Sequence, residues 1–123
     1  MKTLLHGTTS ERAKRIVLLG PDPNFVEPGG FANAEGFSTC LENGPFPLGR
    51  PEEYAFGKSN EFPEESGPVI LAIDVPDEIV ALAVNEIFPL SQGVVQFDEG
   101  AGLGELQACW STLHKEIRSV KRP

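Results

Sequence analysis

Side chains that could bind or transform a ligand occur in four short segments of the chain. In sequence order the segments are His6-Gly7-Thr8, Gly36-Phe37-Ser38-Thr39, Glu53-Tyr54-Ala55 and Gly104-Glu105-Leu106-Gln107. An imidazole can donate or accept a hydrogen bond, a glycine allows close backbone approach, and an aromatic ring offers a face for stacking. A fixed carboxylate can stabilise a developing positive charge. These segments are therefore the candidates for a functional site.

The first segment lies between a predicted strand and a predicted helix. The chain starts in an extended stretch, Lys2 to His6, and then enters a run of residues that favour helix N-caps, Gly7-Thr8-Thr9-Ser10. Ala13, Ile16 and Val17 recur at helical spacing, and Gly20-Pro21 ends the pattern. We expect a strand, a turn and an amphipathic helix.

Further elements follow a Pro- and Gly-rich stretch, residues 21–35, which we expect to be a surface loop. A short strand is predicted at Gly36 to Leu41, and a helix is predicted to start at Pro51. The β-branched run Pro68 to Pro76 predicts a strand buried on both faces and central in the sheet. A helical turn is expected within residues 76–84 and a strand at Val94 to Phe97.

The last third of the chain allows two interpretations. We predict a strand at Gly104 to Trp110, because the nearby glycines make a poor helix start and Cys109-Trp110 suits a buried strand. The alternative is one helix from Leu103 to Val120, because apolar residues recur there at spacings of three and four. The catalytic role considered for Glu105 below depends on the strand.

Composition indicates one folded domain covering residues 1–123, built from strands and short helices in an α+β arrangement. The net charge of −8 disfavours nucleic acid and anionic lipid as general partners, although Arg12, Lys14 and Arg15, and Lys115, Arg118, Lys121 and Arg122, form local basic clusters. The longest apolar runs are too short to cross a bilayer. With two widely spaced cysteines, expected to be free thiols, we expect a cytoplasmic protein without a membrane partner.

Several site classes are disfavoured by the absence of their motifs. The sequence has no P-loop pattern, and the glycines at 100, 102 and 104 lack the spacing and the setting of a dinucleotide fingerprint. No zinc spacing or EF-hand pattern occurs, so no metal site is predicted. A nucleophilic pair of Cys40 or Cys109 with His6 or His114 remains an alternative, because such partners can meet in space.

The order of the four segments resembles the ADP-ribosyltransferases of the poly(ADP-ribose) polymerase and diphtheria-toxin type. In that family a His-Gly-Ser/Thr triplet ends the first strand, as His6-Gly7-Thr8 does here. The resemblance implies a split, mostly antiparallel sheet with NAD, the substrate, bound between its two halves. It also implies that His6 binds adenosine-ribose hydroxyls and that the Gly7 backbone pairs with the nicotinamide carboxamide.

The second and third segments match further family motifs beside the nicotinamide. Phe37, Ser38 and Thr39 resemble the residues of the family's strand that lies next to the nicotinamide ring. Tyr54 resembles the aromatic residue that a helix of the family presents to the same ring. The chain departs from the histidine-type branch at Phe37, where many members have Tyr. Ser38-Thr39 is similar to the arginine-type Ser-Thr-Ser motif, so the branch stays open.

The family's third motif is a glutamate near the start of a late strand. Glu105 is the best match and would stabilise the positive charge that develops as the glycosidic bond of NAD breaks. Glu116 is the rival, because residues 114–117 could also start a strand.

The resemblance implies transfer of ADP-ribose from NAD to an unknown acceptor, either protein or nucleic acid. A non-enzymatic nucleotide- or protein-binding module on the same or another small α+β fold is the alternative. The oligomeric state is left open.

Overall fold

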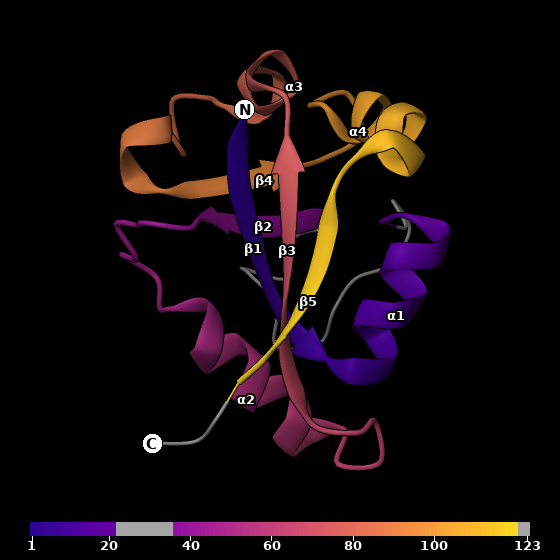
Figure 1. The fold of residues 1–123 in the computed structure, drawn as a ribbon. Helices are drawn as coiled ribbons and strands as arrows, with labels where there is room; N and C mark the ends of the chain where they lie inside the picture. Colours follow the sequence, from indigo (N-terminus) through magenta and orange to yellow (C-terminus); the bar gives the residue numbers. More distant parts are fainter. Residues whose placement is uncertain (22–35, 121–123) are drawn as a thin grey trace.

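The structure is a computed structural model and describes residues 1–21 and 36–120. It is an α+β fold in which five antiparallel strands form one sheet in the order β4-β2-β1-β3-β5 (Figure 1). The strands are β1 (Lys2–Thr9), β2 (Phe37–Leu41), β3 (Pro68–Val75), β4 (Val94–Phe97) and β5 (Lys115–Ser119). The helices are α1 (Ser10–Leu19), α2 (Pro51–Glu61), α3 (Asp77–Ala83) and α4 (Leu103–Cys109), with short 3₁₀ turns η2 (Leu90–Gln92) and η3 (Trp110–Thr112).

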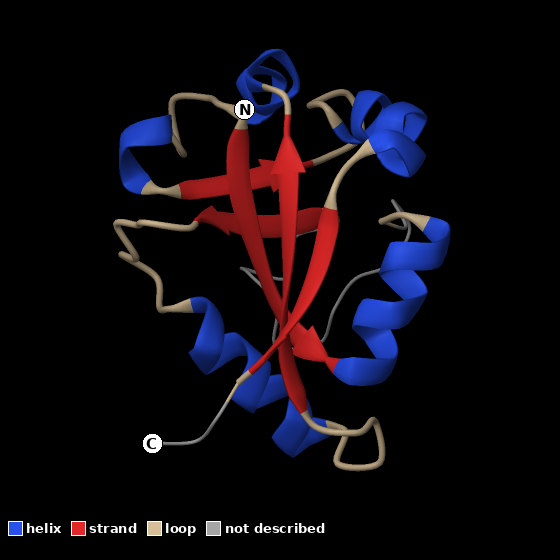
Figure 2. Ribbon diagram, viewed as in Figure 1, coloured by secondary structure: helices blue, strands red, loops and turns tan. Residues whose placement is uncertain are grey.

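The sheet divides into two parts that meet between β1 and β2. β1 pairs with β3 along its whole length, from Lys2 to Thr9, but its register with β2 consists of Leu4 with Leu41 and Leu5 with Cys40. β2 then pairs with β4, so β2 and β4 run across the direction of the other three strands (Figure 2). The α+β class with an antiparallel sheet is confirmed, and the five strands belong to one sheet.

One face of the sheet carries the main hydrophobic core. Leu4, Leu71 and Phe97, none of which has exposed surface, pack there with side chains from α1, α3 and α4. The opposite face carries a smaller cluster of Leu5, Ile70 and Ala72. Because side chains alternate across a strand, successive residues of β1 point to opposite faces of the sheet.

The junction from β1 to α1 follows the predicted signals. The Thr9 hydroxyl accepts a hydrogen bond from the Arg12 backbone N–H at 3.3 Å, which makes Thr9 the N-cap. Gly20 ends the helix with φ 83°, a backbone conformation that favours glycine, and its N–H donates to the Ile16 carbonyl. The predicted strand, turn and helix are confirmed.

Most other predicted elements are also confirmed, namely β2, α2, α3 and β4. β3 is an interior strand, as predicted, but β1 occupies the middle of the sheet. The predicted loop at residues 21–35 lies outside the described residues except for Pro21, as do Lys121 and Arg122. Within the described ranges, no helix has the length and apolar character needed to cross a membrane.

The prediction of a strand at Gly104 to Trp110 was wrong, because residues 103–109 form α4. Leu103, Leu106 and Trp110 lie on one face of this segment and are each 5% exposed or less in the main core. Gly102 adopts φ 91° at the N-cap, so this glycine permits the helix start that we expected it to prevent. Burial of the apolar face outweighs the local cost of glycine.

The alternative prediction of one long helix from Leu103 to Val120 is wrong as well. After η3 the backbone becomes extended at Leu113, and β5 pairs with β3 through Ile117 opposite Leu71. The apolar spacing therefore belongs to two elements, a helix and an edge strand.

A half-buried ion pair ties α1 to the segment before β3. The Arg12 Nε lies 2.7 Å from Glu65 Oε1, and the two side chains are 11% and 14% exposed. The Thr9 hydroxyl donates to the same carboxylate oxygen at 2.9 Å. Burial raises the pKa of Glu65, but hydrogen bonds from Arg12 and Thr9 and the charges of Arg12 and Arg15 lower it more, so the pKa lies below its usual 4.5.

We expect Glu65→Gln to reduce the free energy of unfolding by about 1–3 kcal/mol at neutral pH, the range for hydrogen bonds to a charged group. Because the native pKa is lowered, ionised Glu65 stabilises the fold above its unfolded-state pKa. This contribution is lost as the pH falls through the native pKa.

Urea unfolding of the wild type and the variant, at neutral pH and at steps below pH 4.5, measures both effects. The difference between the two proteins should shrink in acid. Glu64→Gln, at an exposed neighbour, is the matched control and should behave as wild type. An unfolding free energy of Glu65→Gln equal to that of wild type at neutral pH would contradict the role of this pair.

Candidate functional site

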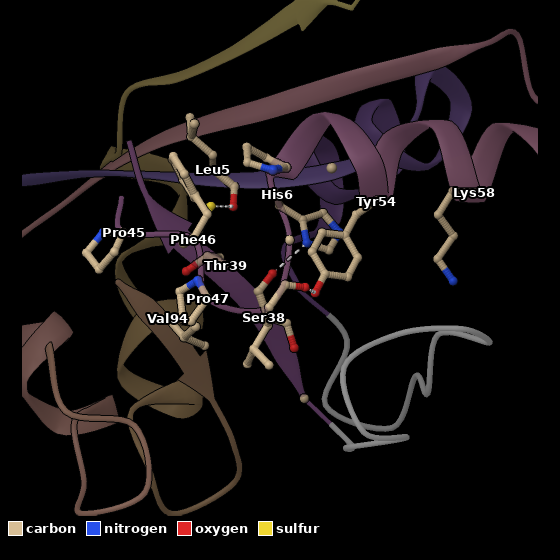
Figure 3. Close-up of a pocket in the computed structure, with 16 residues that line it drawn as sticks. Leu5, His6, Ser38, Thr39, Pro45, Phe46, Pro47, Tyr54, Lys58 and Val94 are labelled. Atoms are coloured by element: carbon tan, nitrogen blue, oxygen red, sulfur yellow. Dashed lines mark hydrogen bonds between the residues drawn. The ribbon is translucent and has the colours of Figure 1, made fainter. Parts of the chain in front are cut away.

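A pocket opens where the two parts of the sheet separate, on the face covered by α2 (Figure 3). Its space is about 750 Å³, which includes space open to solvent. The lining comes from the sheet, from the segment before α2 and from α2 itself. The lining residues are 5–7, 38–40 and 94 of the sheet, Gly36 just before β2, 45–49 of the segment before α2, and Pro51, Tyr54 and Lys58 of α2.

His6 joins the two parts of the sheet at the pocket. Its Nδ1 lies 2.8 Å from the Ser38 carbonyl oxygen, which can only accept a hydrogen bond, so Nδ1 carries the proton. The ring is 7% exposed and packs against Phe37 with 4.6 Å between ring centroids. The imidazole therefore has a fixed orientation beside the pocket.

A chain of polar side chains continues from Ser38 onto β4. The Ser38 hydroxyl donates to Gln96 Oε1, and Gln96 Nε2 donates to Asp98 Oδ1 at 3.1 Å. Ser38 lies directly opposite Gln96 in the register of β2 and β4, and Gln96 is 4% exposed. This network fixes the Ser38 hydroxyl and brings a carboxylate to the border of the site.

Tyr54 forms part of the α2 wall of the pocket, and its ring is held in place by a hydrogen bond from its hydroxyl to the Leu48 carbonyl. Burial, with smaller effects of Cys40 and Glu53, raises its pKa, so the phenol stays protonated and remains a donor. Tyr54 and His6 both line the pocket (Figure 3). One polar wall of the pocket is thus built from β1, β2 and α2.

Cys40 also lines the pocket but is a poor nucleophile. Burial, followed by the charge of Glu52, raises the pKa of its thiol to about 11, against a smaller lowering by Arg50. Its Sγ lies 3.8 Å from the Leu5 carbonyl oxygen. Because the reactive form is the thiolate, this environment disfavours the alternative of a Cys40–His6 nucleophilic pair.

Gly7 is required by packing between the sheet and α2. A Cβ at this position would collide with the Pro51 carbonyl oxygen and would lie 2.9 Å from the Ala55 backbone nitrogen. The missing side chain therefore lets α2 lie directly on β1. This contact has a structural reason that does not involve a ligand.

The structure brings together five of the seven predicted cofactor-binding residues, His6, Gly7, Ser38, Thr39 and Tyr54. The Thr39 hydroxyl donates a hydrogen bond to the Val95 carbonyl at 2.8 Å. The other two, Thr8 and Phe37, are not among the lining residues; Thr8 is fully buried, and Phe37 packs in the main core against His6 and Trp110.

Neither predicted carboxylate is among the residues that line the pocket. Glu105 is exposed in the first turn of α4, a helix that packs on the main core through Leu103 and Leu106. Glu116 lies in a strand, which is the condition for its role as the alternative catalytic carboxylate. However, it is exposed on β5, and its Oε2 lies 3.6 Å from the Arg118 Nε. β5 is separated from β2 by β3 and β1.

Sequence analysis missed three residues at or beside this site. Lys58 lines the pocket, and Gln96 and Asp98 form the network behind Ser38. Lys58 could have been found from its position four residues after Tyr54 on a predicted helix, since such residues share a face. Nothing in the sequence pairs Gln96 with Ser38, because that contact depends on the register of β2 and β4.

No metal centre is found among the described residues, since no three His, Cys, Asp or Glu side chains gather there in a suitable group. No protein-family model, curated protein or solved structure was found to match the chain.

We expect Gly7→Ala to reduce the free energy of unfolding by about 1–3 kcal/mol, because the added methyl group overpacks the contact between β1 and α2. Gly57→Ala is the matched control on α2, where a Cβ would meet nothing within 4 Å. That variant should be neutral or stabilising by up to about 1 kcal/mol. Chemical denaturation measures both, and equal stability of the two variants would contradict the packing role of Gly7.

Proposed function

We propose that this domain binds NAD, with the nicotinamide ring in the pocket beside Tyr54. The observation that carries the proposal is the convergence of three separate segments of the sequence. The family resemblance implies that His6, the pair Ser38 and Thr39, and Tyr54 bind NAD, and all four residues line one pocket.

The pocket suits a flat ring attached to a polar remainder. Tyr54, Phe46 and three prolines supply most of the bulky apolar lining, while His6 and the hydroxyl residues supply polar atoms on one side. The hydrogen bonds of Tyr54 and His6 hold both rings in position. Little ordering is therefore needed when a ligand binds, which favours affinity.

NAD at millimolar concentration should raise the melting temperature of the wild type, because a ligand of the native state stabilises it by mass action. Tyr54→Ala should weaken NAD binding about tenfold, on the order of 1.4 kcal/mol, since it removes one aromatic wall. Tyr54→Phe, which keeps the ring, should retain most of the affinity.

Calorimetric titration of the three proteins with NAD measures these affinities. Phe56→Ala is the control for loss of an aromatic residue from α2, because Phe56 is not among the lining residues. Absence of any response of the folded wild type to NAD would refute the proposal. The alternative of a protein-binding module would then stand.

Transfer of ADP-ribose to a protein or nucleic-acid acceptor is a second candidate function, favoured by the position of Asp98. A Cβ on Gly36 would collide with the Asp98 Oδ1, and Gly36 lines the pocket. In the reaction, the bond between C1′ of the ribose and the nicotinamide nitrogen breaks, and nicotinamide leaves with the electron pair. An acceptor oxygen or nitrogen then bonds to C1′ and loses a proton, and a carboxylate stabilises the positive charge in between.

If the domain catalyses this step, Asp98→Asn should reduce nicotinamide release about 10²–10³-fold and leave NAD affinity nearly unchanged. Asparagine keeps an acceptor for Gln96 but removes the charge. Glu105→Gln and Glu116→Gln should release nicotinamide as wild type does, since neither residue lines the pocket. Full activity of Asp98→Asn would exclude Asp98 as the carboxylate that stabilises the positive charge. Absence of nicotinamide release by the wild type would rule out transfer and leave NAD binding as the function.

A further inference from the structure

Lys58 occupies an unusual position for a lysine. The residue is 5% exposed, although lysine is among the residues least often buried. Among the described lining residues of the pocket, Lys58 alone carries a formal charge at neutral pH. The chain as a whole has a net charge of −8, so this lining cation is opposite in sign to the net charge of the protein.

The helix places Lys58 next to the proposed ring site. Tyr54 and Lys58 are four residues apart in α2, which sets them about 6 Å apart along the helix axis and on nearly the same face. Figure 3 shows both side chains projecting from α2 on the same side, with Pro45 and Phe46 at the other end of the pocket. The pocket therefore has an apolar end and a cationic end, with Tyr54 between them.

From this polarity we infer that Lys58 binds an anionic group of the ligand, a phosphate joined to the ring that lies beside Tyr54. The inference rests on the proposed function and names the part of NAD that Lys58 contacts. A lysine ammonium has three N–H donors, so it can bind a phosphate oxygen and keep contacts within the protein. Such charge-assisted hydrogen bonds are stronger than neutral ones, and more so where water is partly excluded.

A pair of ligands that differ by one phosphate tests the inference. Nicotinamide mononucleotide has the phosphate, and nicotinamide riboside lacks it. The wild type should bind the mononucleotide at least about tenfold more tightly than the riboside, as expected for a hydrogen bond to a charged group. Lys58→Met, which keeps the aliphatic length but not the charge, should abolish this difference and leave riboside affinity unchanged. Lys58→Arg should preserve the difference.

Lys14→Met is the matched control, because it removes the same charge from an exposed position of α1 outside the pocket. It should bind both ligands as wild type does. Melting temperature and circular dichroism of each variant verify folding. If folded Lys58→Met keeps the wild-type preference for the mononucleotide, the inference is wrong.

Inorganic pyrophosphate separates this inference from the NAD proposal. Stabilisation by pyrophosphate that is lost in Lys58→Met, with no response to NAD or its fragments, would retain the anion site and refute the nicotinamide site. Binding of NAD with equal affinity to wild type and Lys58→Met would do the reverse. No response to any of these ligands would overturn both.

Discussion

The short contact between β1 and β2 is the constraint on which the rest of the site depends. The two strands pair at Leu4 with Leu41 and at Leu5 with Cys40, and beyond this point the side chain of His6 holds them together through the Ser38 carbonyl. Continued backbone pairing would close the space between the strands. The imidazole instead keeps the sheet connected while the pocket opens beside it.

A second contact sets the depth of the pocket. Because Gly7 has no side chain, α2 lies directly against β1, and the same helix then presents Tyr54 and Lys58 to the pocket. The glycine of the His-Gly-Thr triplet thus has a role in the fold independent of any ligand. A residue of a motif that suggests chemistry can owe its identity to packing, and Gly7 has such a packing role.

The polar groups of the site are mostly engaged with one another. The hydroxyls of Ser38, Thr39 and Tyr54 donate to Gln96, Val95 and Leu48, respectively. These side chains are therefore held in place by the protein itself, and the proposed ligand would contact ring faces, backbone groups and the ammonium of Lys58. The chain has 18 acidic residues, yet the described lining contains none, which supports the proposed ligand with a negative charge away from its ring.

Short-range sequence patterns predicted most of the local elements and five of the residues that line the pocket. Thr9 caps the start of α1 and Gly20 ends it, Pro51 starts α2, and the β-branched run forms β3. These elements can be predicted because capping, proline geometry and residue periodicity act over a few neighbouring positions. The secondary structure of residues 103–120 depends on tertiary contacts. Burial of Leu106 and Trp110 favours a helix in the segment that we expected to form a strand, Gly104 to Trp110. Tertiary structure also decided which charged and polar residues meet the pocket. The contact of Ser38 with Gln96 joins residues 58 positions apart and exists because β2 and β4 pair in one register, which short-range sequence patterns do not encode.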